Sequence, residues 1–348
     1  MGTNHTQRVM IYTDLTTKGM LAVLDQVNAQ TNSNQQTIEK DWWVTQVMRV
    51  LFSQPYAKHL SFKGGTSLSK AWNIIERFSE DIDIAVSREY LGFEGELSRT
   101  QVSDKLRRAA CAFVRETMQN DLREGLIALG IAPEKFKVHV NITSVTTTDP
   151  EIINIDYQSV LPNSEYIVHT VKVEVGGRSM AEPVQRVSIQ SQIDAVLPQA
   201  TIVQPSFDVN VVVPERTFLE KIFLLHEEFA KPMAQVRTER MSRHLYDLQR
   251  MLHTNIAQRA LQNEALYRAV VEHRRKFIYL RDFDYDTLYP KYLSLEIPTN
   301  VLDLWRKDYE TMQRTMIYGD TVPFDDLLVE IRQLNRYINK LPYLLHQE

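Results

Sequence analysis

The stretch Lys63-Gly-Gly-Thr-Ser-Leu-Ser-Lys70, followed by Arg77-Phe-Ser-Glu-Asp-Ile-Asp-Ile-Ala-Val86, is the most informative part of this chain. A Gly-Gly pair at the start of a helical pattern predicts a turn with bare backbone N–H groups, which attract anions. The Asp-Ile-Asp-Ile alternation predicts a strand on which Asp81 and Asp83 share one face, while the isoleucines enter a core. Paired carboxylates of this kind are typical Mg²⁺ ligands. Together, these features indicate a site that handles nucleotides.

The residues next to the glycine pair have phosphate-binding and structural interpretations. Gly64 and Gly65 leave N–H groups bare, and the hydroxyls of Thr66 and Ser67 can meet the β- or γ-phosphate of a nucleotide. The same hydroxyls can cap the helix, and capping uses the same geometry. Arg77 lies four residues before the first aspartate, where it can bind phosphate or pair with a nearby glutamate.

A third carboxylate is expected, because two metal ions usually require three. In the predicted strand 168–175, Glu174 and Lys172 share one face and valines occupy the other. Glu174 is therefore our candidate for third metal ligand or general base. The pattern is equally consistent with an exposed strand glutamate, and Asp156 and Asp208 are competing candidates.

Two later helical segments contribute a lysine and an aspartate. Lys221 flanks the apolar stripe of the predicted helix 218–229, where it can reach into a cleft or extend along the edge of the core. Asp247 lies away from the stripe of the following helix. It is spaced i,i+4 from Arg243, a spacing that allows a simple surface ion pair. Periodicity alone assigns neither residue to an active site.

The first block, Gly64-Gly65-Thr66 with Arg77-x-Ser79-x-Asp81-Ile82-Asp83, resembles the core signature of the nucleotidyltransferase superfamily. More narrowly, the chain resembles the AbiEii/AbiGii toxin family of toxin–antitoxin and abortive-infection systems. Glu39-Lys40-Asp41-Trp42-Trp43 resembles the helix that leads into the family's core. Thr217–Lys221 and Arg243–Leu248 resemble its later Lys and Arg-x-x-x-Asp elements.

The resemblance implies a function and assigns roles to the candidate residues. It implies a nucleotidyltransferase toxin that uses Mg²⁺ or Mn²⁺ to move a nucleotide from an NTP to an acceptor. The expected acceptor is the 3′ end of tRNA, and its modification would block translation. A cognate antitoxin is the expected partner, with or without a stable complex. The implied catalytic residues are Asp81, Asp83, Glu174, Lys221 and Asp247, the first three as metal ligands. The implied nucleotide-binding residues are Gly64, Gly65, Thr66, Ser67, Arg77 and Lys221.

The order of predicted elements indicates an α+β fold. We expect a small mixed β-sheet of nucleotidyltransferase type, flanked by helices, and a mostly helical C-terminal domain. The predicted parts are an N-terminal extension (1–32), a core domain (33–213) and a helical domain that contributes to the cleft (214–348). Helices are predicted from a cap at Ser33-Asn34 to Pro55 and over 100–129, and further strands over 137–143, 168–175 and 207–213.

Composition narrows the class of protein. A hydrophobic content of 43% and a charged content of 24% are ordinary for a globular protein. The net charge of −4 argues against nucleic-acid binding through bulk charge but leaves a local basic patch open. Cys111 is the only cysteine and is expected to be a buried helix residue. The histidines show no zinc-ligand spacing. With no membrane-length apolar run and no signal-like N-terminus, a cytoplasmic protein is expected.

One tract near the C-terminal end combines basic and aromatic residues. The sequence His273-Arg-Arg-Lys-Phe-Ile-Tyr-Leu-Arg281 can track a single RNA strand or a tRNA end. A solvated helix end with buried aromatic residues explains the same pattern equally well.

Two other functions are consistent with the motifs. The same fold could transfer a nucleotide to a protein side chain or a small molecule. Alternatively, the chain could be a nucleotide-binding module without catalysis. The intact Asp81/Asp83 pair argues against such a module, because binding alone does not require two repelling carboxylates.

Overall fold

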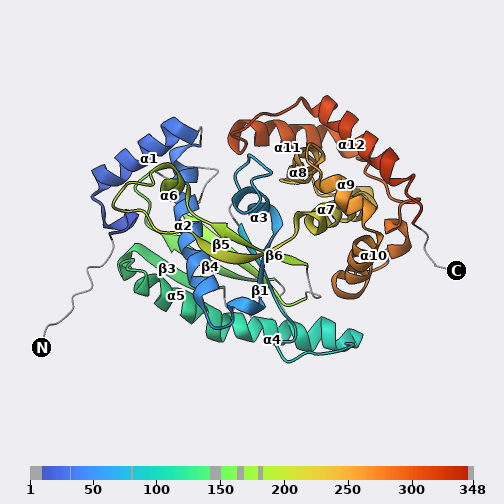
Figure 1. Ribbon diagram of the computed structural model, residues 1–348. Coiled ribbons are helices and arrows are strands. Elements are labelled where there is room, and N and C mark those ends of the chain that lie inside the picture. Colours follow the sequence, from blue (N-terminus) through green and yellow to red (C-terminus); the bar gives the residue numbers. More distant parts are fainter. Residues whose placement is uncertain are drawn as a thin grey trace, which may run out of the picture.

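The computed structural model describes residues 10–31, 33–79, 81–141, 150–162, 168–178 and 183–343. Within them, seven strands form one mixed sheet in the order β3-β4-β5-β2-β1-β7-β6. Figure 1 shows helices α7 to α12 gathered on one side of this sheet and α1 and α2 toward the other. The predicted α+β class is confirmed.

The strands are β1 (Leu60–Lys63), β2 (Asp81–Val86), β3 (Phe136–Val140), β4 (Glu151–Tyr157), β5 (Thr170–Gly176), β6 (Val184–Ile189) and β7 (Phe207–Val212). The helices of the sheet region are α1 (Thr17–Thr31), α2 (Gln35–Ser53), α3 (Gly64–Lys70), α4 (Leu106–Phe113), α5 (Gln119–Ala128) and α6 (Gln192–Val196). The later helices are α7 (Pro214–Phe229), α8 (Arg243–Leu252), α9 (Ile256–Gln262), α10 (Glu264–His273), α11 (Leu302–Thr315) and α12 (Phe324–Ile338).

Four of the observed strands, β2, β3, β5 and β7, were predicted from alternating patterns. Strands β1, β4 and β6 were not predicted, and two of them, β1 and β6, lack a visible alternating pattern for different reasons. β1 has only four residues, too few for a period to show. β6 is an edge strand whose residues are mostly exposed, so it carries no apolar alternation. Helix α3, the helical pattern predicted after the glycine pair, is short and ends at Lys70.

The centre of the sheet positions the acidic residues. β2 pairs parallel with β5, which places Asp83 opposite Glu174. On its other side β2 pairs antiparallel with β1, which places Asp83 opposite Lys63. Ile82 and Ile84 are fully buried in the core on the opposite face. The alternation predicted for this strand is therefore confirmed.

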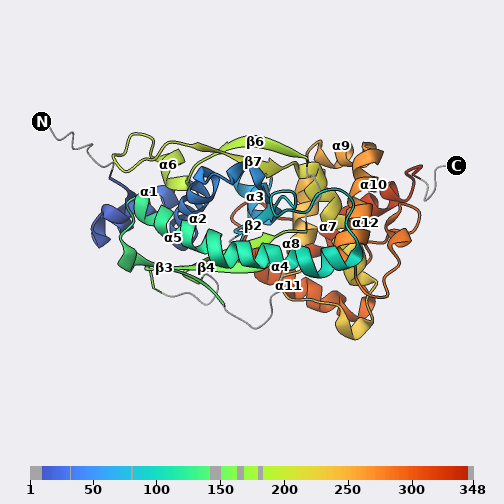
Figure 2. The same cartoon turned by 90° about the horizontal axis from the view of Figure 1, so that it is seen from below.

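Helix α2 and a long helical segment cover the apolar face. Asn34, rather than Ser33, caps α2, and its side chain accepts a hydrogen bond from Thr37 N at 2.8 Å. Residues 101–128 keep right-handed helical geometry at every junction, so α4 and α5 belong to one continuous rod that runs along the sheet (Figure 2). Cys111 lies buried on this rod, as expected.

The buried side chains form two large hydrophobic clusters. The first combines the sheet with α1, α2 and the α4–α5 rod, so residues 10–31 pack against the same core as the strands. The second combines helices α7 to α12 with Leu68 and Ile75. The first helix after the strands, α7, begins at Pro214. The division into three parts stays a prediction.

Helices α2 and α5 approach each other closely at Gly125. A Cβ atom there would lie 2.3 Å from Cγ1 of Val50, which is buried. We therefore predict that Gly125→Ala lowers the free energy of unfolding by about 1–3 kcal/mol through overpacking. Urea denaturation measures this change. Glu124→Ala, an exposed change on the same helix, should leave the transition in place, and equal effects of the two changes would contradict the prediction.

Candidate active site

The Gly64-Gly65 turn packs directly against the acidic strand. Gly64 has a φ of +78°, a backbone conformation that residues with a side chain rarely adopt. A Cβ atom there would lie 1.9 Å from Oδ2 of Asp83. A Cβ atom at Gly65 would lie 2.8 Å from Nη2 of Arg77 and 3.0 Å from Oγ of Ser79. The two glycines are therefore required for the turn to contact the carboxylate on one side and the arginine segment on the other.

The hydroxyls of Thr66 and Ser67, which follow the glycines, stabilise this turn through hydrogen bonds. The Thr66 hydroxyl donates to the backbone carbonyl of Asp81 and lies 2.9 Å from Ser79 Oγ. The Ser67 hydroxyl donates to the carbonyl of Gly64 at 2.8 Å. Both side chains are buried. Their structural role is thus present, and a phosphate contact remains a proposal.

The three predicted acids lie on adjacent parallel strands. Asp81 and Asp83 lie on β2, and Glu174 lies on β5 directly opposite Asp83. Burial, Glu174 and Asp81 raise the pKa of Asp83 to about 7, although Lys63 and Arg243 oppose the shift. Burial and Asp81 likewise raise the pKa of Glu174. The carboxylates therefore repel one another, and a bound cation would relieve that repulsion.

The competing third acids are occupied elsewhere. Asp156 accepts a hydrogen bond from Thr170 at 2.6 Å, at the opposite end of β5 from Glu174. Asp208 pairs with Arg186 at 2.9 Å on the edge of the sheet. Glu174 is the candidate that the strand register places beside Asp83.

Asp81 and Asp83 suit a metal ion whose other ligands are substrate phosphates and water. In the described part of the chain, no three His, Cys, Asp or Glu side chains form a ready metal cluster. However, Oδ1 of Asp81 is buried and has no hydrogen-bond partner among these residues. Mg²⁺ is usually held by one or two carboxylates plus substrate phosphates and water. The Asp81/Asp83 pair fits that requirement.

Arg77, Asp247 and Lys221 form a buried ion cluster. Nε and Nη2 of Arg77 donate to the two carboxylate oxygens of Asp247 at 2.7 and 2.8 Å. Nζ of Lys221 lies 2.8 Å from Oδ2 of the same carboxylate. The exposed fractions are 2% for Arg77, 0% for Asp247 and 6% for Lys221. Asp247 therefore does not form the surface pair with Arg243 that its spacing allowed, and Arg77 pairs with it rather than with a nearby glutamate.

The electrostatics of this cluster follow from burial and charge. Burial alone would raise the pKa of Asp247, but Arg77 and Lys221 together lower it below its ordinary value. Burial lowers the pKa of Lys221, and Asp247 opposes the shift. Arg243 is half-buried and interacts electrostatically with Asp81, Asp83 and Glu174. It is a cation beside the acids, a position that the i,i+4 spacing did not reveal.

Asp83 and Glu174 open into a cavity of about 210 Å³ between the sheet and the helical lobe. Lys63, Asp83 and Glu174 line it from the strands, and Glu220 and His273 line it from α7 and α10. Lys63 and Glu220 therefore line the site. The sequence indicated Lys63 only as a weaker phosphate-binding candidate, because a lone lysine near a turn is usually solvated, and it did not single out Glu220. Both lie one residue from a motif position (Gly64 and Lys221), which is the signal that could have indicated them.

The basic tract after α10 is largely neutralised by carboxylates. Arg274 is buried and makes two hydrogen bonds to Glu227. Arg275 pairs with Asp286 at 2.7 Å, and Lys276 pairs with Glu96. This arrangement corresponds to the structural interpretation of the tract rather than to a free RNA-binding strip.

Comparison with known proteins identifies the family. The family model described as nucleotidyl transferase AbiEii toxin, type IV TA system, matches residues 47–330, which is most of the chain. The chain therefore belongs to the AbiEii family, whose members are nucleotidyltransferase toxins of type IV toxin–antitoxin systems. The family implies an antitoxin partner.

Other comparisons add little to this assignment. The crystal structure of JHP933 from Helicobacter pylori is similar, with 14% identity and a TM-score of 0.35 over 87% of this chain and 97% of that one. No curated protein matches the chain. No helix in the described residues has the length and apolar character needed to cross a membrane.

The buried ion cluster predicts a large stability effect. Asp247→Asn would leave Arg77 and Lys221 buried without a compensating negative charge. We expect it to lower the free energy of unfolding by about 3–5 kcal/mol, the typical result of breaking a buried ion pair. Chemical denaturation at neutral pH measures the change.

The control is an exposed ion pair of the same residue types. Asp325→Asn removes the partner of Arg306, 2.7 Å away on the surface. Its unfolding transition should coincide with that of the wild type, because exposed pairs contribute little. Matching transitions for Asp247→Asn and Asp325→Asn would contradict the role given to the buried cluster.

Proposed function

We propose that this protein transfers a nucleotide from an NTP to the 3′ end of tRNA and thereby blocks translation. The observation that carries the proposal is the strand register that places Asp83 opposite Glu174, with the Gly64-Gly65 turn packed on the same carboxylate. Membership in the AbiEii family supports the reaction class. The proposal goes beyond the family assignment in naming tRNA as the acceptor and in including a metal ion.

A divalent ion, Mg²⁺ or Mn²⁺, would supply charge neutralisation of the triphosphate and a lower pKa for the attacking hydroxyl. Asp81 and Asp83 are the residues that would hold it. Two observations support this assignment: Oδ1 of Asp81 is buried without a hydrogen-bond partner among the described residues, and the pKa of Asp83 is raised.

The protein's own groups position the reactants. Gly64, Gly65, Thr66 and Ser67 form the turn that receives the phosphates, and Arg243 adds positive charge beside the acids. Glu174 opens into the cavity beside Asp83, where it can accept the proton of the acceptor hydroxyl. Its raised pKa favours such a role, because a base works best when its pKa is near the ambient pH.

The buried cluster positions this machinery rather than entering the reaction. Asp247 has no exposed surface, and both of its oxygens already accept hydrogen bonds from cations. Its partner Arg77 lies four residues before Asp81. We propose that Arg77 and Asp247 hold the segment leading into β2, while Lys221, which is next to the cavity-lining Glu220 on α7, neutralises Asp247.

A labelling assay tests the proposed reaction. Purified protein would be incubated with Mg²⁺, each α-³²P-NTP and total tRNA, beside an Asp81→Ala/Asp83→Ala variant. Label in tRNA with the wild type alone is the expected result. Label in a protein band instead would assign the protein acceptor, and binding of NTP without transfer would favour a nucleotide-binding module.

The role of Glu174 has its own prediction. Glu174→Gln keeps the size of the side chain but removes its capacity to accept a proton or neutralise a cation. We expect transfer to fall by at least about 10²-fold, the lower end of the range for general-base loss. Circular dichroism should show an unchanged fold. The control is Asp156→Asn, which changes a competing carboxylate on β4 and should leave transfer near the wild-type level. Near-normal transfer by Glu174→Gln would remove Glu174 from the mechanism.

A further inference from the structure

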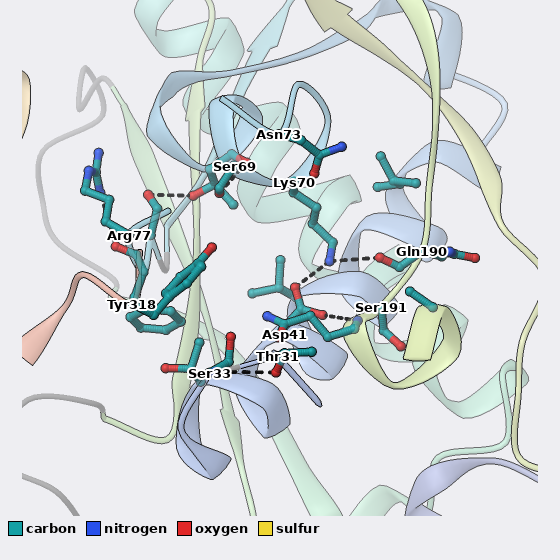
Figure 3. Close-up of a pocket in the computed structure, with 18 of the residues that line it drawn as sticks. Thr31, Ser33, Asp41, Ser69, Lys70, Asn73, Arg77, Gln190, Ser191 and Tyr318 are labelled. Carbon is teal, nitrogen blue, oxygen red and sulfur yellow. Dashed lines mark hydrogen bonds and ion pairs between the residues drawn. The ribbon is translucent and has the colours of Figure 1, made fainter. Parts of the chain in front are cut away.

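A second cavity, of about 610 Å³, adjoins the glycine turn (Figure 3). Gly64 faces Asp83 in the acidic cavity, whereas Gly65 faces Arg77 and Ser79, which line this larger one. The turn that receives the phosphates in the proposed function therefore contacts residues of both cavities. A volume of this size lies within the range of roughly 300–1,000 Å³ that is typical of small-molecule sites.

The charges that line the larger cavity are internally neutralised. Nζ of Lys70 donates to Oδ1 of Asp41 at 2.6 Å and to the carbonyl of Gln190 at 3.2 Å, as Figure 3 shows. Arg77 is neutralised by Asp247. Most other lining residues are serine, threonine, asparagine or glutamine. Such walls offer little charge for a phosphate chain but many hydrogen-bond partners for a sugar and a base.

Fixed polar groups in the wall of the larger cavity provide hydrogen-bonding partners for a ligand. Oδ2 of Asp41 accepts from the backbone N–H of Gln192 at 2.8 Å, so two elements hold this carboxylate in place. Oε1 of Gln192 is buried and lacks a hydrogen-bond partner among the described residues. A buried acceptor without a donor is costly, and a ligand N–H or O–H would satisfy it.

Tyr318 adds a flat wall from the helical side of the protein. Its ring is half-buried and lines the cavity, across from Gln190 and Ser191 in Figure 3. Burial and the nearby Asp41 raise the pKa of Tyr318 to about 12, so its hydroxyl remains a donor at neutral pH. An aromatic face beside hydrogen-bond donors and acceptors suits a nucleobase.

We propose that this cavity holds the nucleoside part of the donor NTP, with the triphosphate at the glycine turn and the acceptor in the acidic cavity. The proposal rests on the proposed function and adds to it the separation of donor and acceptor. Asp41, Gln192 and Tyr318 are then the residues that contact the sugar and base.

A cavity-filling substitution tests this assignment. Ala195 is an exposed residue of α6 that lines the cavity, so Ala195→Phe adds a ring there without changing the core. Ala22→Phe is the matched control, since Ala22 is an exposed residue of α1 away from the cavity. Tyr318→Ala provides an independent variant that deletes the flat wall.

Isothermal titration calorimetry would measure binding of the four nucleoside α,β-methylene triphosphates and of inorganic tripolyphosphate, each with Mg²⁺. We expect Ala195→Phe and Tyr318→Ala to weaken the nucleotide that wild type binds best by about tenfold or more, with tripolyphosphate changed by less than about twofold. Ala22→Phe should match wild type with both ligands.

Three outcomes would overturn the inference. Unchanged nucleotide binding by both cavity variants, with transfer to RNA intact, would reject this cavity while leaving the proposed function in place. Equal losses for nucleotide and tripolyphosphate would place phosphate, not nucleoside, in the cavity. If wild type neither binds nor transfers any NTP, the proposed function fails and the inference fails with it.

Discussion

The structure depends on a carboxylate that is buried between the sheet and the helical lobe. Asp247 on α8 binds Arg77, which is 170 residues earlier in the chain, and Lys221 on α7. Removing these charges from water is expensive, and the cost is offset only when all three groups keep their partners. This requirement fixes the helical lobe against the segment that leads into β2. It therefore also fixes where Asp81 and Asp83 lie relative to α7 and α8.

Two cavities lie on either side of the glycine turn. The acidic cavity contains Asp83 and Glu174, whereas the larger cavity contains neutral polar groups and the Lys70–Asp41 pair. A transfer reaction between two substrates requires separate places for a donor and an acceptor. In the proposed function of this member of the AbiEii family, the larger cavity would hold the donor nucleoside and the acidic cavity the acceptor.

Local patterns in the sequence were sufficient to predict the acidic strand and the glycine turn. The period of Asp81-Ile-Asp-Ile determines which side chains share a face, and the structure confirms that alternation. The burial of Asp247 could not be predicted in this way, because on α8 it lies off the apolar stripe and its partners, Arg77 and Lys221, come from other segments of the chain. The larger cavity was also missed, since its walls combine motif residues such as Arg77 and Ser79 with distant segments that carry no motif.

We propose that the Arg77–Asp247 pair holds Asp81 and Asp83 in a productive position. The most direct measurement is the initial rate of nucleotide transfer by Asp247→Asn, at a temperature where circular dichroism shows that the variant is folded. We expect a loss of about 10²-fold, because small displacements of reacting groups have effects of that size. A folded Asp247→Asn protein that transfers nucleotide at the wild-type rate would contradict this positioning role.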